Sequence, residues 1–223
     1  MKFKIAWLAM AVVLAPNALA DQEENIDKES KVAPDSTISN LIVANNLAMK
    51  GVEDKDPLLL ITSAKLIKLN SVEQKDREKK SEGGTKSTKQ ERARYDAQTL
   101  LEYAEEWSGD NDAYASLIKQ VENLSTRGRI GGNAIHSDRV EAGAVDTYVV
   151  PFYGREVAEV AVIGDGDTDI DLHIYDHNGN LICEDTDATD TTYCYWVPRF
   201  DGDFIITIKN YGSVYNAYDL LTN

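Results

Sequence analysis

Cysteine and histidine are scarce in this sequence, and their scarcity argues against two kinds of site. The 223 residues contain two cysteines and three histidines. The cysteines lack the C-x-x-C spacing of redox or metal pairs. His173 and His177 have a helical spacing but fall in an expected strand and turn, and His136 lies near a domain boundary. We therefore predict no zinc site.

Basic residues are fewer than acidic ones, and common catalytic motifs are missing. The chain carries 23 Lys and Arg against 38 Asp and Glu, a formal charge of −15, which disfavours binding to nucleic acid phosphates. Neither H-E-x-x-H nor G-x-S-x-G occurs, and no nucleophile and base can be paired from the sequence. A non-enzyme that binds cations or basic partners suits this composition better than a catalyst.

Long apolar runs are missing after the first twenty residues, which have the pattern of a secretory signal peptide. Lys2 and Lys4 precede an apolar run from Ile5 to Leu14, and Ala18-Leu19-Ala20 supplies an A-x-A cleavage site. The run is shorter than the roughly 20 residues that span a bilayer. We predict that residues 1–20 are removed and that the mature chain is secreted or periplasmic, with no membrane span.

The N-terminal half of the mature chain has a helical pattern. Residues 21–35 are polar and are predicted to form a flexible lead-in. Within a predicted helical domain over 36–126, apolar residues recur at helical spacing in two pairs of segments, and Gly51 is expected to end the first helix. Two αα-hairpins of this kind could pack as a four-helix unit or as a short tetratricopeptide-like stack.

Residues 71–93 interrupt the helical domain with almost no apolar side chains. Lysines and arginines alternate there with Glu, Ser, Gly and Thr, and the acidic residues dilute the basic charge. We predict a solvated, charged linker.

The C-terminal part, residues 136–223, has the short alternating runs of an antiparallel β-sandwich, with turn signals between them. The expected fold class is α+β, with helical hairpins followed by the sandwich. Cys183 and Cys194 both lie in this β-rich part of an exported chain, so we predict a disulfide. In the chain-entropy model a loop of about a dozen residues stabilises the fold by roughly 2 to 3 kcal/mol.

This C-terminal part resembles the bacterial pre-peptidase C-terminal (PPC) domain family. The resemblance covers about residues 136–223 and is carried by E-A-G-A-V-D-T-Y at 141–148, G-D-G-D-T-D-I-D-L at 164–172, D-H-N-G-N at 176–180, G-D-F at 202–204 and Y-D-L at 218–220. It implies a sandwich that helps secreted enzymes adhere to substrate or mature, and some relatives bind calcium. The cysteine pair and the missing peptidase domain depart from the family's pattern, and the helical region resembles no family.

Acidic residues converge at one end of a predicted hairpin. With Asn178-Gly179 as a two-residue turn, Tyr175 should pair with Ile182, Ile174 with Cys183 and His173 with Glu184. Inward-facing residues are then Ile170, Leu172, Ile174, Leu181 and Cys183. The register gathers eight carboxylates that either hold Ca²⁺ or make turn hydrogen bonds and a solvated acidic tip: Asp165, Asp167, Asp169, Asp171, Glu184, Asp185, Asp187 and Asp190.

Tyrosines form a second candidate surface. Alternation directs Cys194 and Trp196 toward the core and leaves Tyr193 and Tyr195 on the other face, while Tyr211 and Tyr215 precede the last expected strand. Exposed tyrosines could hold a polypeptide or glycan, or they could pack against neighbouring strands.

Together these patterns predict an exported, non-catalytic adhesion module that binds an extracellular or periplasmic protein or polymer, with possible calcium dependence. Two alternatives stay open. One is an accessory protein or inhibitor of a secreted peptidase, and the other is a hydrolase with an unrecognised site.

Overall fold

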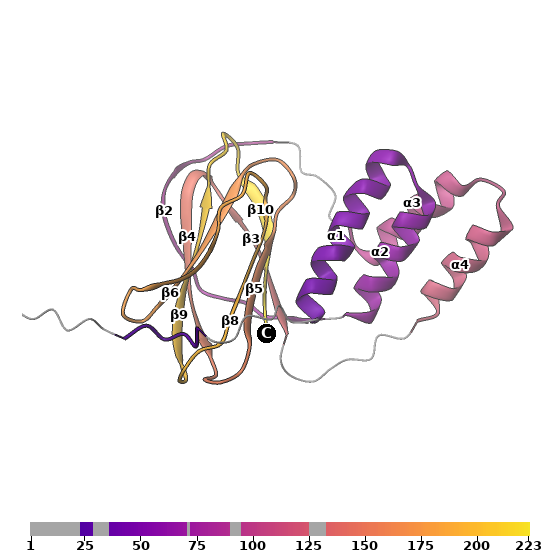
Figure 1. The fold of residues 1–223 in the computed structure, drawn as a ribbon. Coiled ribbons are helices and arrows are strands. Elements are labelled where there is room, and N and C mark those ends of the chain that lie inside the picture. The colour runs from indigo at the N-terminus through magenta and orange to yellow at the C-terminus, as the bar shows by residue number, and fades with distance from the viewer. Residues whose placement is uncertain (1–22, 29–35, 71, 90–94, 125–132) are drawn as a thin grey trace, which may run out of the picture.

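The α+β fold class is confirmed by a computed structural model, in which helices come first and strands follow. The model describes residues 23–28, 36–70, 72–89, 95–124 and 133–223, so the predicted signal peptide lies outside the described residues. Figure 1 shows the helices on one side of a two-layered sandwich, with α1 beside the nearer layer.

Four helices form two hairpins, and each begins at a polar N-cap. The helices are α1 (Thr37–Asp54), α2 (Pro57–Leu69), α3 (Ala97–Ser108) and α4 (Asp112–Glu122). Ser36 and Ser39 make a reciprocal capping box at α1, and the Asp56 carboxylate accepts from the Leu58 amide at 2.8 Å at α2. The N-caps of α3 and α4 are Asp96 and Asn111.

Gly51 does not end the first helix as predicted, because α1 continues to Asp54 and stops at Lys55, which has a positive φ of 52°. Gly51 is instead buried where α1 crosses α2, and a Cβ there would come within 2.8 Å of Leu60 Cδ2. Close helix packing explains this glycine better than a helix stop. The apolar centre of the helical part is made of Ala48, Leu60, Ile61, Ala64, Leu100, Leu101, Ala104, Ile118 and Val121.

The sandwich has two five-stranded sheets, here called sheet A and sheet B. Sheet A has the order β1 (Glu73–Gln74), β3 (Ala134–Val140), β10 (Asn216–Thr222), β5 (Ala158–Ile163) and β8 (Thr191–Trp196). Sheet B has the order β2 (Lys80–Thr85), β4 (Ala142–Phe152), β9 (Gly202–Asn210), β6 (Ile170–Asp176) and β7 (Leu181–Asp185). All pairs are antiparallel except β1 with β3.

Alternate side chains of both sheets fill the space between them. Phe152, Trp196 and Phe204 form an aromatic centre, with Phe152 and Trp196 ring centroids 5.0 Å apart. The predicted disulfide is confirmed: Cys183 on β7 is bonded to Cys194 on β8, with their Cα atoms 6.0 Å apart. The bond therefore ties the edge of sheet B to the edge of sheet A.

The predicted β6–β7 register is correct away from the turn and wrong beside it. His173 pairs with Glu184 and Ile174 with Cys183 as expected, but Tyr175 pairs with Leu181 across a register shift. Gly179, with a φ of 84°, makes the connection one residue longer than the expected two-residue turn. Leu181 is therefore 45% exposed, and Ile182 packs against the core in its place.

The prediction of a solvated linker over 71–93 is wrong for residues 73–85, which supply the edge strand β1 to sheet A and the edge strand β2 to sheet B. We call residues 73–89 the strap. Every side chain of β1 and β2 is exposed, so apolar alternation gave no signal for these strands. Their pairing rests on backbone hydrogen bonds and on polar side chains such as Lys79 and Ser81.

The predicted flexible lead-in over 21–35 is wrong for residues 23–28, which lie against the end of the sandwich. Asn25 is fully buried, its amide donates to Asp176 Oδ2 at 3.0 Å, and its side chain donates to the Phe200 carbonyl at 3.0 Å. Ile26 packs against the sandwich core. A buried asparagine that satisfies backbone groups fixes the segment even though its composition is polar.

Helix α1 covers the outer face of sheet A. Ile38 is buried there with Ala161 of β5 and Leu221 of β10. The Ser36 hydroxyl donates to Glu159 Oε1 at 2.6 Å beside this contact. Sheet A is consequently enclosed between the sandwich core and a helix, whereas sheet B lies on the far side from the helices (Figure 1).

Candidate binding surfaces of the sandwich

The loops that carry most of the predicted acidic site meet at one end of the sandwich, here called the acidic end. Asp190 is 6% exposed, and its Oδ2 accepts from the Gly166 amide at 2.5 Å and from the Asn216 side chain at 3.1 Å. Gly164 packs so closely on Asp190 that a Cβ would lie 2.3 Å from Oδ2. Asp190 therefore acts as a loop anchor.

Lys89 of the strap neutralises part of the acidic end. Its ammonium pairs with Asp165 and, at 2.6 Å, with Asp167, and its side chain is 9% exposed. The same ammonium lies 4.6 Å from the centre of the Tyr215 ring. Burial alone would lower the pKa of Lys89, but the two carboxylates outweigh it and raise that pKa above its ordinary value.

Asp169 and Asp171 form a separate pair next to Tyr211. Burial and the neighbouring charge of Asp169 raise the pKa of Asp171 above its usual range. Tyr211 hydrogen-bonds Asp171, and the charge of that carboxylate raises the pKa of the Tyr211 hydroxyl. The ionised carboxylates of Asp169 and Asp171 repel one another. Protonation of Asp171 therefore stabilises this part of the acidic end.

The remaining carboxylates bind local partners. Asp185 accepts from the Tyr193 amide at 2.8 Å, Asp187 accepts from the Thr189 amide at 2.9 Å, and Glu184 lies 3.6 Å from His173 Nε2. Among the described residues no group of three or more Asp, Glu, His or Cys is placed to hold a metal ion. The eight predicted ligands are thus divided among separate contacts, and calcium binding at the acidic end stays a prediction.

The four tyrosines predicted as a binding surface do not share a face. Tyr193 packs under α1 and donates to Glu159 at 2.6 Å, and Tyr195 stacks beside it. Tyr215 is only 5% exposed and lies between Lys89 and Arg139. Tyr211, 59% exposed, is the one of the four that presents most of its side chain to solvent. Packing is therefore the main role of Tyr193 and Tyr215.

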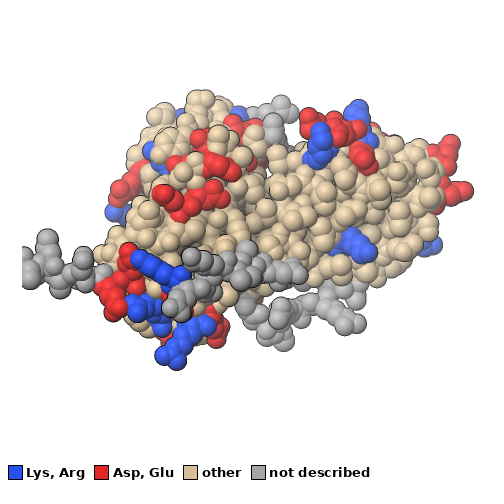
Figure 2. All heavy atoms as spheres, viewed as in Figure 1, with Lys and Arg blue, Asp and Glu red and all other residues tan. Residues whose placement is uncertain are grey.

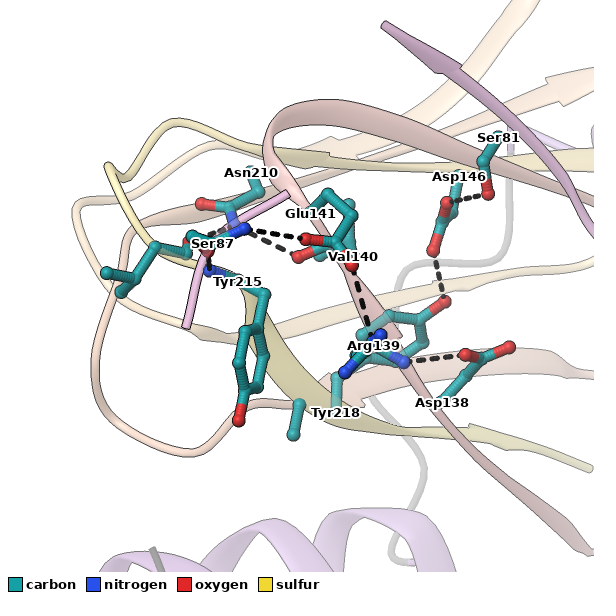
Figure 3. A network of polar contacts seen from close by, with 12 residues as sticks. Ser81, Ser87, Asp138, Arg139, Val140, Glu141, Asp146, Asn210, Tyr215 and Tyr218 are labelled. Carbon is teal, nitrogen blue, oxygen red and sulfur yellow. Dashed lines mark hydrogen bonds and ion pairs between the residues drawn. The ribbon is translucent and has the colours of Figure 1, made fainter. Parts of the chain in front are cut away.

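A buried polar network that the sequence analysis missed holds the strap on the sandwich. Tyr218 donates to Asp146 Oδ2 at 3.0 Å, and its oxygen lies 2.5 Å from that of Tyr148. Ser81 and Lys79 approach the same carboxylate at 2.5 and 2.9 Å, and Figure 3 shows Ser81 and Tyr218 on its two oxygens. Burial raises the pKa of both tyrosines, which stay protonated donors. The signal available was Asp146 itself, a carboxylate at an inward-facing strand position.

The strap also lies along the acidic end beyond this network. Ser87 Oγ accepts from the Tyr215 amide at 2.7 Å, and Asn210 donates to the Val140 carbonyl at 3.2 Å nearby (Figure 3). The bonds of Ser87 connect the strap with the loop before β10 and with Glu141, which follows β3. The segment that was expected to be solvated therefore supplies hydrogen-bond partners to polar groups of the sandwich.

The outer face of sheet B, here called the open face, carries a row of apolar side chains across four strands. Register places Val149 beside Ile205, Ile205 beside Tyr175, and Tyr175 beside Leu181. Val149 is 61% and Leu181 45% exposed. The next row contains Thr147, Thr207, His173 and Glu184. Exposed apolar groups bordered by polar ones are typical of interaction surfaces.

No protein-family model and no curated protein matches this chain. Solved structures with some similarity include the pre-peptidase C-terminal domain of a Bacillus anthracis collagenase, with 8% identity, a TM-score of 0.25, and coverage of 40% of this chain and 76% of that one. A Yersinia pseudotuberculosis-derived mitogen has 16% identity and a TM-score of 0.30, over 42% and 86% of the two chains.

A third similar structure is the carbohydrate-binding module CBM36 in complex with calcium and xylotriose. It has 14% identity and a TM-score of 0.24, over 46% of this chain and 93% of that one. Similarities of this size carry no argument about ligand or family, so the function has to be argued from the residues. Within the described ranges, no helix is long and apolar enough to cross a membrane.

Proposed function

We propose that this chain is an exported, non-catalytic binding protein whose sandwich holds an extracellular or periplasmic protein or polymer on the open face of sheet B. The observation that carries the proposal is the difference between the two outer faces. Helix α1 covers sheet A, whereas the apolar row that contains Val149 and Leu181 stays exposed on sheet B. An exposed apolar row gains free energy when a partner removes it from water.

Membership of the PPC family is part of this proposal and is supported by the segments at 141–148 and 164–172. Export is supported by the signal-peptide pattern of residues 1–20 and is consistent with the Cys183–Cys194 disulfide. A non-catalytic role is supported by the burial of the polar core. Asp146 and Tyr218 are at most 1% exposed, so neither can reach a substrate as an acid or base.

Affinity capture from the exported fraction tests the open face. The mature chain and its Val149→Asp variant are immobilised and compared, with Leu69→Asp as the matched control because Leu69 is a similarly exposed apolar residue on α2. We expect the wild type and Leu69→Asp to retain the same protein or polysaccharide and Val149→Asp to lose it, since a charge in the row opposes desolvation. Thermal melts confirm that both variants are folded.

Equal capture by Val149→Asp and the wild type would contradict the proposal. Loss with Leu69→Asp alone would move the binding surface to the helices. A hydrolase screen on the same mature chain addresses the enzymatic alternative, because activity abolished by one point substitution would replace binding as the main function.

A further inference from the structure

The end of the sandwich opposite the acidic end carries two arginines beside acidic residues such as Asp201 and Glu23. Here the β4–β5 connection packs against the β8–β9 connection, and together they line an open depression of about 430 Å³ with Gly154, Arg155, Arg199, Phe200 and Asp201. In Figure 2 a group of blue Lys and Arg side chains, beside a few red ones, lies at the lower end of the sandwich, where these connections lie in Figure 1. We call this depression the arginine pocket.

The backbone around the arginine pocket is held rigidly. A Cβ on Gly154 would lie 2.5 Å from Phe200 Cα, so the two connections can approach this closely only with glycine. The Gly154 amide donates to Asp201 Oδ1 at 2.7 Å, and the Arg155 amide donates to the Pro198 carbonyl at 2.7 Å. The acidic residue Asp201 also lines the pocket, but its carboxylate accepts this hydrogen bond from the backbone.

Arg155 has a backbone conformation that arginine rarely adopts. Its φ is 63°, in the left-handed region where glycine carries no strain and other residues cost about 1 kcal/mol or more. Among the described residues its guanidinium makes no ion pair, although Glu156 follows it in the chain. An unstrained glycine would serve this turn better, so the folded state alone does not account for an arginine here.

The second arginine already binds a carboxylate of the N-terminal segment. Glu23, in the N-terminal segment, pairs with Arg199 Nη1, and Asn25 fixes that segment by accepting from the Arg199 and Phe200 amides at 2.9 and 3.1 Å. Phe200 is 46% and the neighbouring Tyr153 is 72% exposed. Arginine and aromatic side chains around a pocket are the residues that dominate binding energy at protein interfaces.

We propose that the arginine pocket binds a carboxylate side chain of an acidic peptide segment in a partner protein, with Arg155 as the ion-pair partner and Phe200 and Tyr153 contacting the adjacent apolar residue. A peptide is favoured because this chain's own N-terminal segment presents Glu23 to Arg199 beside the pocket. Guanidinium groups suit carboxylates because their paired N–H donors match the two oxygens. The pocket is separate from the open face, so this proposal does not rest on the proposed function.

Fluorescence anisotropy with two labelled, doubly capped peptides tests the pocket on the mature chain. One peptide alternates Glu with Leu, and the other replaces each Glu by Gln. We expect the wild type to bind the Glu peptide at least tenfold more tightly than the Gln peptide at low salt, with a smaller ratio near 150 mM salt. Equal affinity for both peptides would overturn the proposal.

Two variants of Arg155 separate binding from folding. Arg155→Met should lower affinity for the Glu peptide at least tenfold, whereas Arg139→Met, a matched arginine at the other end of the sandwich, should leave it unchanged. Arg155→Gly should lose the same affinity while its melting temperature stays equal or rises, because glycine relieves the φ of 63°. Wild-type affinity in both Arg155 variants would contradict the assignment.

A capped oligogalacturonide is the comparison ligand for acidic carbohydrate. If it binds in an Arg155-dependent way and the Glu peptide does not, the peptide assignment is wrong. If the Glu peptide binds and Val149→Asp has no effect on it, the arginine pocket is independent of the open face, as proposed.

Discussion

The two ends of the sandwich satisfy their polar groups in different ways, but each uses a segment from outside the predicted sandwich. At the acidic end, Lys89 of the strap enters between Asp165 and Asp167. At the end with the arginine pocket, Asn25 of the N-terminal segment bonds the backbone at Arg199 and Phe200, and Arg155 keeps its guanidinium without an ion pair among the described residues. Part of the charge at the acidic end is neutralised by the strap, whereas Arg155 at the other end has no ion pair among the described residues.

Removal of the Asn25 side chain should give the largest loss of stability. Asn25→Ala deletes one donated and two accepted hydrogen bonds at a fully buried position and leaves the Arg199 and Phe200 backbone without partners. At about 1 kcal/mol for each bond we expect the free energy of unfolding to fall by about 3 kcal/mol. Denaturant unfolding measures this value, and limited proteolysis should cut the released N-terminal segment first.

Lys28→Ala is the control for that segment. Lys28 is mostly exposed and, among the described residues, pairs with Glu24 on the surface at 2.5 Å, so its removal should change stability by less than about 0.5 kcal/mol. If Asn25→Ala were as mild as Lys28→Ala, residues 23–28 would not contribute to the stability of this end.

Removal of the Lys89 ammonium should have the next largest effect. Lys89→Met keeps the length of the stem but leaves Asp165 and Asp167 without their shared cation, and we expect a loss of about 2 kcal/mol in denaturant unfolding. Lys86→Met is the strap control, since Lys86 precedes the acidic contacts. If Lys89→Met left the free energy of unfolding unchanged, the ion pairs of Lys89 would not stabilise the acidic end, and the contrast between the two ends would be lost.

The pH dependence of the same pair has a definite sign. Because the folded state raises the pKa of Lys89, its contribution is complete below the unfolded pKa of about 10.4 and is lost as the pH rises through the folded value. The stability difference between the wild type and Lys89→Met should therefore shrink above about pH 10.5. The comparison isolates Lys89, since the buried Tyr148 and Tyr218 are present in both proteins and their contribution cancels.

Calcium addition gives a further comparison between the wild type and Lys89→Met, measured as the shift in melting temperature. With Lys89 present, we expect no thermal shift of the wild type at millimolar calcium. Lys89→Met removes the ammonium that pairs with Asp165 and Asp167, so a divalent cation can take its place and the melting temperature should rise on calcium addition. A calcium-dependent shift of the wild type alone would favour the predicted calcium site over neutralisation by Lys89.

Sequence patterns recovered the parts of the fold that rest on apolar periodicity. The helices, the inward positions of Ile170, Leu172 and Ile174 and the disulfide follow from spacing and residue type. What escaped prediction is held by polar contacts between segments distant in the chain. No local pattern connects Lys89 with Asp165, 76 residues away, or Asn25 with Phe200, 175 residues away.

The contacts around the candidate sites escaped prediction for the same reason. Clustering of carboxylates along the β6–β7 hairpin was visible in the sequence, but the partners that divide them, such as Lys89 and Asn216, come from other loops. Arg155 gave no signal because its unusual φ is a property of the folded turn. The turn at Gly179 is one residue longer than predicted. This difference was enough to place Leu181 at the surface and Ile182 against the core, the reverse of the prediction.

The smallest expected effect concerns the carboxylate repulsion that Lys89 does not relieve. Burial and Asp169 raise the pKa of Asp171, so the folded state binds more protons there than the unfolded chain and the protein gains stability as the pH falls through that range. Asp171→Asn should therefore be more stable than the wild type at pH 7, by less than about 1 kcal/mol, and the two should converge near pH 3. Chemical denaturation at both pH values measures the difference. A variant less stable than the wild type at pH 7 would show that the charge of Asp171 stabilises this end, because the asparagine carbonyl still accepts from Tyr211.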